Sequence, residues 1–189
     1  MTEYPWHRNL IDQSKSYKFQ TYSGQTFDYM NFNNYDFDIE VIARSLSHIS
    51  RWFGHTHFFY SVAQHSVLVS QFCPTKNLAK WGLMHDCGEA FLGDIGSPLK
   101  RLIGPRITYL EDSILTAIAK QHKLDGDSIP KEVTVVDLQV LETERHLITN
   151  TCESLWKKNV DRLPISSIPE LTHIEARNQF LDKYHELFD

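Results

Sequence analysis

The sequence predicts a predominantly helical fold, and three observations support this prediction. From Asp38 onward, apolar residues recur at intervals of three and four, the spacing that places side chains on one face of a helix. Prolines stand where such stretches end or begin, at Pro74, Pro105 and Pro130. A turn sequence, Asp-Gly-Asp at 125–127, separates two of the stretches. We therefore expect an all-α fold, a helical bundle of about six or seven helices with an irregular N-terminal arm.

The N-terminal arm is rich in Tyr, Phe, Asn, Ser and Thr and shows no helical period. Within it, the alternating segment 17–22 and the segment 27–30 flank a Ser-Gly-Gln turn, which predicts a small hairpin. Irregular structure wrapped on the domain is the alternative. We expect a single domain over residues 1–189, made of the arm, a helical core and a C-terminal segment, at 1–37, 38–150 and 151–189.

Each predicted helix is delimited by residues that favour helix ends. Asp38 can cap the first helix, Pro74 ends the second, and Pro130 begins the fifth. The segment 151–168 is ambiguous because prolines interrupt it. The predicted helices cover, in order, residues 39–49, 58–72, 76–92, 105–123, 130–149 and 170–188.

The composition restricts the classes of partner and location. A net charge of −5 disfavours a nucleic-acid backbone or an anionic membrane as the main partner, whereas a small anionic substrate at a metal site is compatible. The 3 cysteines form no Cys-x-x-Cys pattern, which argues against a disulfide framework and favours a reducing, cytoplasmic location. We expect no signal peptide and no membrane-spanning helix, because no stretch approaches about 18 consecutive apolar residues.

The segment 83–95 is the most informative part of the chain, because it sets His85, Asp86, Glu89 and Asp94 among apolar and small residues. In a helix, His85 and Glu89 share a face. Imidazole and carboxylate groups at such positions can converge on one divalent cation, with a further carboxylate nearby to transfer protons. A single His-Asp pair is a weak signal by itself in a chain with 10 histidines.

Two other predicted helices also carry an ionisable group on their apolar face. His65 lies in phase with the apolar stripe of the second helix, and Asp137 occupies a stripe position of the fifth. A carboxylate buried there costs several kcal/mol unless a cation or hydrogen-bond donors meet it. A metal site built from His65, His85, Asp86 and Asp137 explains all these groups together.

Each residue also has a simpler interpretation. Alone, His65 is more often a hydrogen-bonded core histidine, and Asp137 could pair with an arginine or cap a neighbouring helix. Glu89 and Asp94 could be surface carboxylates near a helix end. A di-iron bundle is disfavoured, because it needs Glu-x-x-His on two helices and only residues 170–173 fit.

Taken in order, these residues form a longer pattern: Arg51-Trp52, then the segment 61–66 ending in His65-Ser66, then His85-Asp86-x-x-Glu89-Ala90, Asp94-Ile95 and Pro98-x-Lys100. The pattern resembles that of the HD-domain metal-dependent phosphohydrolases, an all-α superfamily. Within it, the pattern is similar to the branch of 5′-deoxynucleotidases and phage-type dATP triphosphohydrolases. The resemblance covers about residues 38–150 and implies an HD-domain helical bundle for this catalytic core.

The resemblance implies metal-assisted hydrolysis at phosphorus. A divalent cation (Zn, Co, Mn or Mg) would lower the pKa of a water molecule and neutralise charge on a phosphoryl oxygen. Glu89 and Asp94 would be the catalytic carboxylates, one donating a proton to the leaving oxygen and the other orienting the attacking water, in either order. The implied metal ligands are His65, His85, Asp86 and Asp137.

The resemblance also implies substrate-binding residues. Arg51 and Lys100 would hold phosphate oxygens, the first by its planar fork and the second as a point charge. Trp52 would stack on the sugar or base, although a tryptophan beside an arginine is more often a core residue. Pro98 would fix the loop that carries Lys100.

The implied activity is hydrolysis of a deoxynucleoside triphosphate, with dATP preferred, to deoxynucleoside and triphosphate. The basic residues Lys100, Arg101 and Arg106 favour a triphosphate, unless they are only a solvated helix end. A 5′-deoxynucleotidase acting on monophosphates is the alternative, and a nucleotide-binding scaffold on an inactive HD fold is a third possibility. By analogy we expect an even-numbered homo-oligomer whose partner is a small-molecule deoxynucleotide, not a nucleic acid or a membrane.

Overall fold

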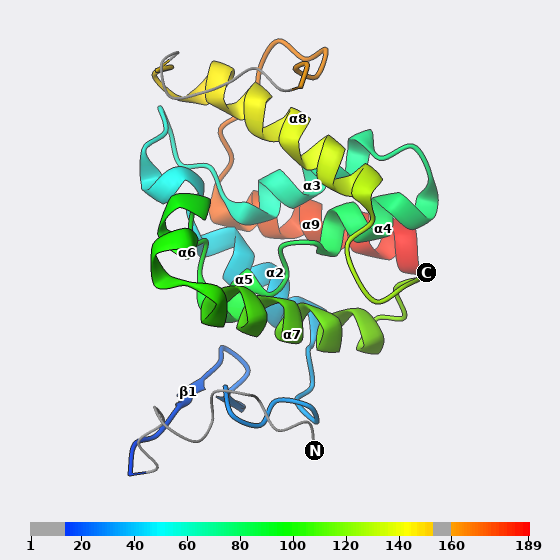
Figure 1. Cartoon of the computed structure of the whole chain (residues 1–189). Coiled ribbons are helices and arrows are strands. Elements are labelled where there is room, and N and C mark those ends of the chain that lie inside the picture. The colour runs from blue at the N-terminus through cyan, green and yellow to red at the C-terminus, as the bar shows by residue number, and fades with distance from the viewer. Residues whose placement is uncertain (1–13, 153–159) are drawn as a thin grey trace. The chain divides into compact units, whose positions relative to one another are not determined.

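The helical core begins where the sequence indicates a helix cap. The computed structural model describes residues 14–152 and 160–189 (Figure 1). Helix α2 (Ile39–His48) starts where the Asp38 side chain accepts a hydrogen bond from the Glu40 backbone N–H. The described chain is mostly helical, with a small hairpin near the N-terminus, which confirms the coarse fold class predicted from the sequence.

The hairpin belongs to the first of two compact units, whose boundary falls between Asp36 and Phe37. It pairs β1 (Lys18–Gln20) with β2 (Thr26–Asp28) in antiparallel register, as predicted. The ring of Phe27 contacts four other aromatic rings of the same unit, those of Phe19, Tyr29, Phe32 and Tyr35. That this arm forms one domain with the helical core stays a prediction.

Helix α3 (Val62–Phe72) begins later than predicted. Ser61 is in an extended conformation, pairs with Ser50 in an isolated antiparallel bridge, and forms a capping box with Gln64. The bridge holds the backbone before Val62 out of the helical region, so the predicted helix start at residue 58 is wrong.

The third predicted helix is interrupted. Helices α4 (Lys76–Met84) and α5 (Glu89–Leu92) are separated by a turn in which backbone hydrogen bonds join residues three apart. The His85 Nδ1–H donates to the Gly82 carbonyl oxygen at 2.8 Å, the acceptor that a continuing α-helix would offer to the Asp86 N–H. The prediction of one continuous helix is therefore wrong, because a side chain competes with the backbone at this point.

One further helix, α6, was not predicted; it lies in the stretch expected only to separate two longer helices. Gly104, with a φ of 94°, separates it from α7, and prolines precede or open α7 and α8 as predicted. Part of the ambiguous segment 151–168 lies outside the described residues. The remaining bounds are α6 (Ser97–Ile103), α7 (Pro105–Gln121), α8 (Lys131–Ile148) and α9 (His173–Phe188).

Helix α3 occupies the centre of the helical unit, where it contacts α2, α4, α8 and α9 (Figure 1). Helix α8 packs on both α3 and α4, so side chains of these three helices meet. The core around them is apolar and fully buried at residues such as Val62, Trp81, Leu83 and Val140. Within the described part of the chain, none of the helices combines the length and apolar character needed to cross a bilayer.

Candidate metal centre

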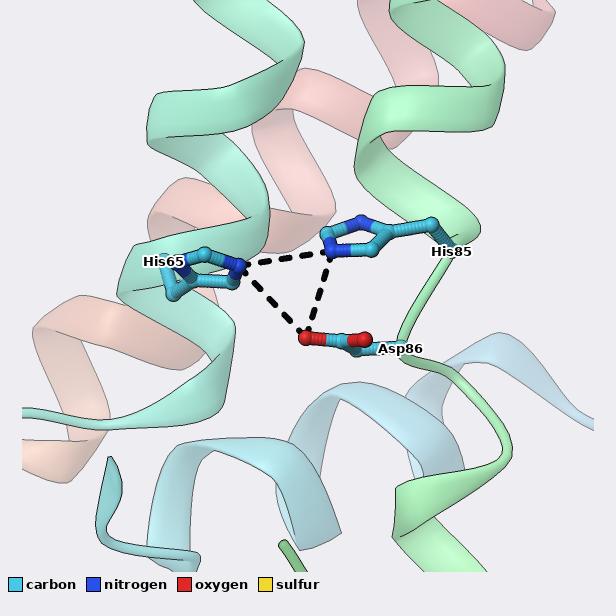
Figure 2. Close-up of side chains that lie close together, drawn as sticks. All are labelled: His65, His85 and Asp86. Atoms are coloured by element: carbon cyan, nitrogen blue, oxygen red, sulfur yellow. Dashed lines mark hydrogen bonds and ion pairs between the residues drawn. The ribbon is translucent and has the colours of Figure 1, made fainter. Parts of the chain in front are cut away.

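Two histidines and an aspartate from neighbouring elements point toward one another (Figure 2). His65 lies in α3, His85 ends α4, and Asp86 lies in the turn that follows. The two Nε2 atoms are 3.3 Å apart, and Asp86 Oδ2 lies 3.5 Å from that of His65 and 3.2 Å from that of His85. These three residues form a group that could hold a metal ion.

Helix α8 brings Asp137 to the same point. Its Oδ1 lies 3.1 Å from His65 Nε2 and 3.9 Å from His85 Nε2. The Asp137 side chain remains 31% exposed, so the centre faces solvent on this side. Three of the predicted ligands thus form one close group, and Asp137 approaches its two imidazoles. The role of all four as ligands stays a prediction.

The outer nitrogen of each imidazole has a fixed hydrogen-bond partner. His65 Nδ1 lies 2.6 Å from Glu144 Oε1, and His85 Nδ1 lies 2.8 Å from the Gly82 carbonyl oxygen. Because both partners are acceptors, each Nδ1 carries the hydrogen. In the neutral imidazoles, both Nε2 lone pairs therefore face the centre, which is the tautomer that a metal ligand needs.

The spacing of the donor atoms fits a divalent cation. Ligand atoms bound about 2.1 Å from a tetrahedral ion lie about 3.4 Å from one another. The donor atoms of His65, His85 and Asp86 are separated by 3.2 to 3.5 Å. Imidazole nitrogens combined with carboxylate oxygens suit zinc and related transition metals better than magnesium.

The charges in contact at the centre are unbalanced without a cation. One guanidinium, that of Arg51, faces the carboxylates of Asp86 and Glu144, and Asp137 adds a third carboxylate beside His65. With neutral imidazoles, this group carries two more negative than positive charges. One divalent cation neutralises it, and so does a proton on each imidazole.

The pKa values reflect this excess of negative charge. Burial lowers the pKa of His65, but Glu144 and the hydrogen bond to Asp137 outweigh burial and raise it to about 9. Burial likewise lowers the pKa of His85, and the neighbouring Asp86 reverses the shift. Burial alone would raise the pKa of Asp86, but the two histidines hold it far below its ordinary value. A cation that binds here therefore competes with protons for the imidazoles.

Glu144, which the sequence analysis did not single out, contacts three of the predicted site residues. Besides His65, it accepts hydrogen bonds at Oε2 from Arg51 Nε at 3.3 Å and from Trp52 Nε1 at 3.1 Å. Its side chain is 0% exposed; burial would raise its pKa, but Arg51 and His65 lower it to about 2. Glu144 follows Asp137 by seven residues, on the same helix face, and that phase was the available signal.

Arg51 and Trp52 lie in a strained turn, the 3₁₀ helix η1 (Arg51–Gly54). Trp52 and Phe53 have φ values of 56° and 53°, in the left-handed region that non-glycine residues rarely adopt. Arg51 is buried, and its Nη1 lies 3.4 Å from Asp86 Oδ2, beside the candidate ligands. The Trp52 ring is held at its indole N–H, and its stacking on a sugar or base stays a prediction.

The two predicted catalytic carboxylates lie near the centre in different surroundings. Glu89 is buried at the start of α5, and its Oε2 has no hydrogen-bond partner among the described residues. Burial, together with Asp86 and Asp94, raises the pKa of Glu89 well above its ordinary value. Asp94 is partly buried; burial raises its pKa, and the charges of Arg51 and Asp86 act on it in opposite directions.

Lys100 and Pro98, two of the predicted substrate-binding residues, lie in α6. Pro98 is in the first turn of α6, and Lys100 follows in the same helix. The Lys100 Nζ forms an ion pair with Glu111 Oε1 of α7 at 2.8 Å, a contact that the sequence did not predict. A cleft of about 360 Å³ between α6 and α7 is lined by Ser97, Lys100, Arg101, Gly104, Pro105 and Thr108. A larger cavity, of about 510 Å³, lies beside α8 and residues 161–166 and includes none of the predicted site residues.

Comparison with known proteins places the chain in a family. Over 170 residues it is 36% identical to a protein of Escherichia coli strain K12 named Uncharacterized protein YfdR, and the match spans 89% of this chain and 94% of YfdR. Over 104 residues it is 36% identical to Uncharacterized protein RCAP_rcc00048 of Rhodobacter capsulatus, covering 51% of this chain and 53% of that protein. No family model matches the chain. The chain belongs to the same family as YfdR.

Proposed function

We propose that this protein is a metal-dependent phosphohydrolase of the HD-domain type that acts on deoxynucleotides. One observation carries the proposal: the Nε2 atoms of His65 and His85 and one carboxylate oxygen of Asp86 lie 3.2 to 3.5 Å from one another, and Asp137 approaches the two imidazoles at 3.1 and 3.9 Å. Groups of this kind tolerate burial together when a shared cation neutralises them.

His65, His85, Asp86 and Asp137 would hold the cation. When bound, a divalent cation supplies a water nucleophile of lowered pKa and neutralises charge that develops on a phosphoryl oxygen. The guanidinium of Arg51, which forms an ion pair with Asp86, would bind a phosphate oxygen close to the same point. Its plane is already oriented by Glu144, so little side-chain entropy is lost on binding.

Glu89 suits the role of proton donor better than Asp94. A general acid must carry its proton near neutral pH. Burial, together with the charges of Asp86 and Asp94, raises the pKa of Glu89 well above its ordinary value, so its carboxyl keeps the proton at higher pH. The more exposed Asp94 would orient the attacking water as an acceptor. With this division of roles, Glu89 would donate its proton to the 5′ oxygen of the deoxynucleoside, which is the leaving group.

The number of phosphates is the point at which two candidate activities differ. The basic cleft lined by Lys100 and Arg101 supports a triphosphate substrate, with dATP preferred as the sequence resemblance implies. The Lys100–Glu111 ion pair supports the alternative, a 5′-deoxynucleotidase, because the distal phosphates must compete with Glu111 for that ammonium group.

A product assay tests the proposal. The purified chain is incubated with each dNTP and each dNMP in the presence of Zn²⁺, Co²⁺, Mn²⁺ or Mg²⁺, and the products are separated by anion-exchange chromatography. We expect deoxynucleoside and inorganic triphosphate from dATP, with chelator-treated protein as the inactive control. Orthophosphate from dAMP, without release of triphosphate, would support the deoxynucleotidase. Absence of turnover with all four metals would overturn both and leave a nucleotide-binding scaffold.

A further inference from the structure

A single buried carboxylate receives hydrogen bonds from both halves of the candidate site. Glu144 Oε1 lies 2.6 Å from the Nδ1 of His65, a candidate metal ligand. Its other oxygen, Oε2, lies 3.3 Å from Arg51 Nε and 3.1 Å from Trp52 Nε1, both on the candidate substrate side. The carboxylate is 0% exposed, so water does not replace these contacts at its surface.

The groups that hydrogen-bond to Glu144 are all donors, and this restricts the residue that can stand there. They are the side chains of His65, Arg51 and Trp52, and the buried hydroxyl of Tyr60 also lies beside the carboxylate. An ionised carboxylate offers acceptors on both oxygens, whereas a glutamine offers one acceptor and one donor. A glutamine at this position must therefore present an N–H either to His65 or to the Arg51–Trp52 pair. In the first case the imidazole tautomer inverts and its Nε2 carries a hydrogen toward the centre. In the second case the arginine and tryptophan lose their anchor.

We propose that Glu144 is the positioning residue that joins the metal-ligating and substrate-binding halves of this site. It holds His65 in the tautomer and orientation that direct the Nε2 lone pair at the cation, and it fixes Arg51 and Trp52 relative to that cation. The inference rests on the proposed function in assuming that a divalent cation binds at His65 and a nucleotide at Arg51.

The first test uses Co²⁺ as a probe and needs no substrate. Chelator-treated protein is titrated with Co²⁺, and binding is followed by its visible absorption and by calorimetry. We expect Glu144→Gln to bind Co²⁺ about 10- to 100-fold more weakly than the wild-type protein, the range seen when such an outer partner of a histidine ligand is lost. The matched control is Glu142→Gln, because Glu142 is also a buried glutamate of α8 and forms an ion pair with Arg145 at 2.6 Å.

Two further measurements keep the test decisive if Glu144→Gln does not fold. Glu144→Asp keeps the charge but shortens the reach by one methylene, so we expect Co²⁺ affinity between those of wild type and Glu144→Gln. Nitrogen-15 NMR of the wild-type protein loaded with Zn²⁺ requires no substitution at all. It should show His65 with its hydrogen on Nδ1, and a hydrogen on Nε2 would contradict the assigned role.

Steady-state kinetics separates positioning from a general loss of structure. Because Glu144 anchors Arg51 and Trp52, we expect Glu144→Gln to raise KM for the nucleotide even at saturating metal, in addition to any fall in kcat. The control Glu142→Gln should lower the thermal midpoint without raising KM. If both variants lower the midpoint equally and neither changes KM or Co²⁺ affinity, Glu144 is only a structural residue.

The outcomes distinguish this inference from the proposed function. Wild-type Co²⁺ affinity in Glu144→Gln overturns the inference alone. Tight, Glu144-dependent Co²⁺ binding without hydrolysis of any nucleotide overturns the proposed substrate and leaves the positioning role of Glu144 supported. Failure of the wild-type protein to bind Co²⁺ overturns both.

Discussion

At the residue scale, Asp137 is the candidate ligand farthest along the chain from the other three, and its side chain is the most exposed of the four. One oxygen of its carboxylate approaches both imidazoles, at 3.1 and 3.9 Å, from a helix that begins far beyond α4. Opposite charge from His65 and His85 lowers its pKa although burial acts the other way, so it stays ionised and able to bind a cation near neutral pH.

Replacing Asp137 should separate metal binding from folding. We expect Asp137→Ala to abolish metal-dependent turnover, with a fall of at least about 100-fold in kcat/KM, because one anionic donor of the centre is lost. The control is Glu132→Ala, which removes an exposed carboxylate from the first turn of the same helix. Turnover in the Asp137 variant at the rate of the Glu132 variant would remove Asp137 from the site.

The pKa of His65 predicts how the stability of the chelator-treated protein depends on pH. Because folding raises this pKa from 6.5 to about 9, the protonated imidazole stabilises the fold fully below pH 6.5, and this contribution is lost as pH rises to about 9. The loss is of the order of 3 kcal/mol. Urea unfolding across this range measures it.

The comparison for that prediction is His65→Gln, which lacks the titrating group. Its free energy of unfolding should vary less between pH 6.5 and about 9 than that of the wild-type protein. Parallel pH profiles for the two proteins would show that His65 does not carry the raised pKa.

The sequence allowed some of these residues to be predicted and not others. His65 and Asp137 were found because a polar group in an apolar stripe is a local anomaly that periodicity reveals. Glu144 shares the helix face of Asp137, but a glutamate near a helix end is usually a surface residue, so its phase alone did not single it out until its partners in α3 and η1 were known. The pairing of Lys100 with Glu111 likewise depends on how α6 packs on α7.

At the element scale, the close contact between α3 and α4 sets the distance between the two histidines. Gly82 permits this contact, because a Cβ at that position would lie 2.9 Å from Cys73 Sγ and 3.0 Å from the Ser70 Cα of α3. The carbonyl of Gly82 also accepts the His85 Nδ1–H, so the same residue sets the helix spacing and the imidazole orientation.

Adding a methyl group at Gly82 should therefore force the two helices apart. We expect Gly82→Ala to lower the free energy of unfolding by about 1–3 kcal/mol and to weaken Co²⁺ binding. Gly88→Ala is the matched control in the neighbouring turn, where the nearest atom to the new Cβ is 3.5 Å away and the backbone is already helical. It should be neutral or slightly stabilising. Equal effects of the two substitutions in urea unfolding would contradict the close-contact argument.

Helix boundaries followed the sequence wherever a cap or a proline decides them locally. Asp38 and Pro130 are such cases, and α2 and α8 begin next to them. The interruption after Met84 could not be predicted in the same way, because the stretch is apolar enough to continue as a helix. It ends there because the His85 side chain takes the Gly82 carbonyl, which is visible only when the side-chain direction is known.

At the scale of the whole molecule, a cation bound to the folded chain alone should raise its thermal stability. At a free concentration about 100 times its dissociation constant, a ligand adds about 2.7 kcal/mol, or roughly 5–10 °C in the thermal midpoint of a chain of this size. Differential scanning calorimetry with and without Zn²⁺ measures the shift. Asp137→Ala should show a much smaller one, and an unchanged midpoint in the wild-type protein would contradict the candidate centre.

The residues that build the centre also differ in how far apart they lie along the chain, and this bears on the order in which the centre forms. His65 and His85 are 20 residues apart in adjoining helices, whereas His65 and Glu144 are 79 apart. Closing the longer loop costs more chain entropy, so we expect the α3–α4 hairpin to form early and α8 to dock late. A cation whose binding requires a ligand from α8 would then leave the rate of refolding nearly unchanged. It would stabilise the protein by lowering the rate of unfolding.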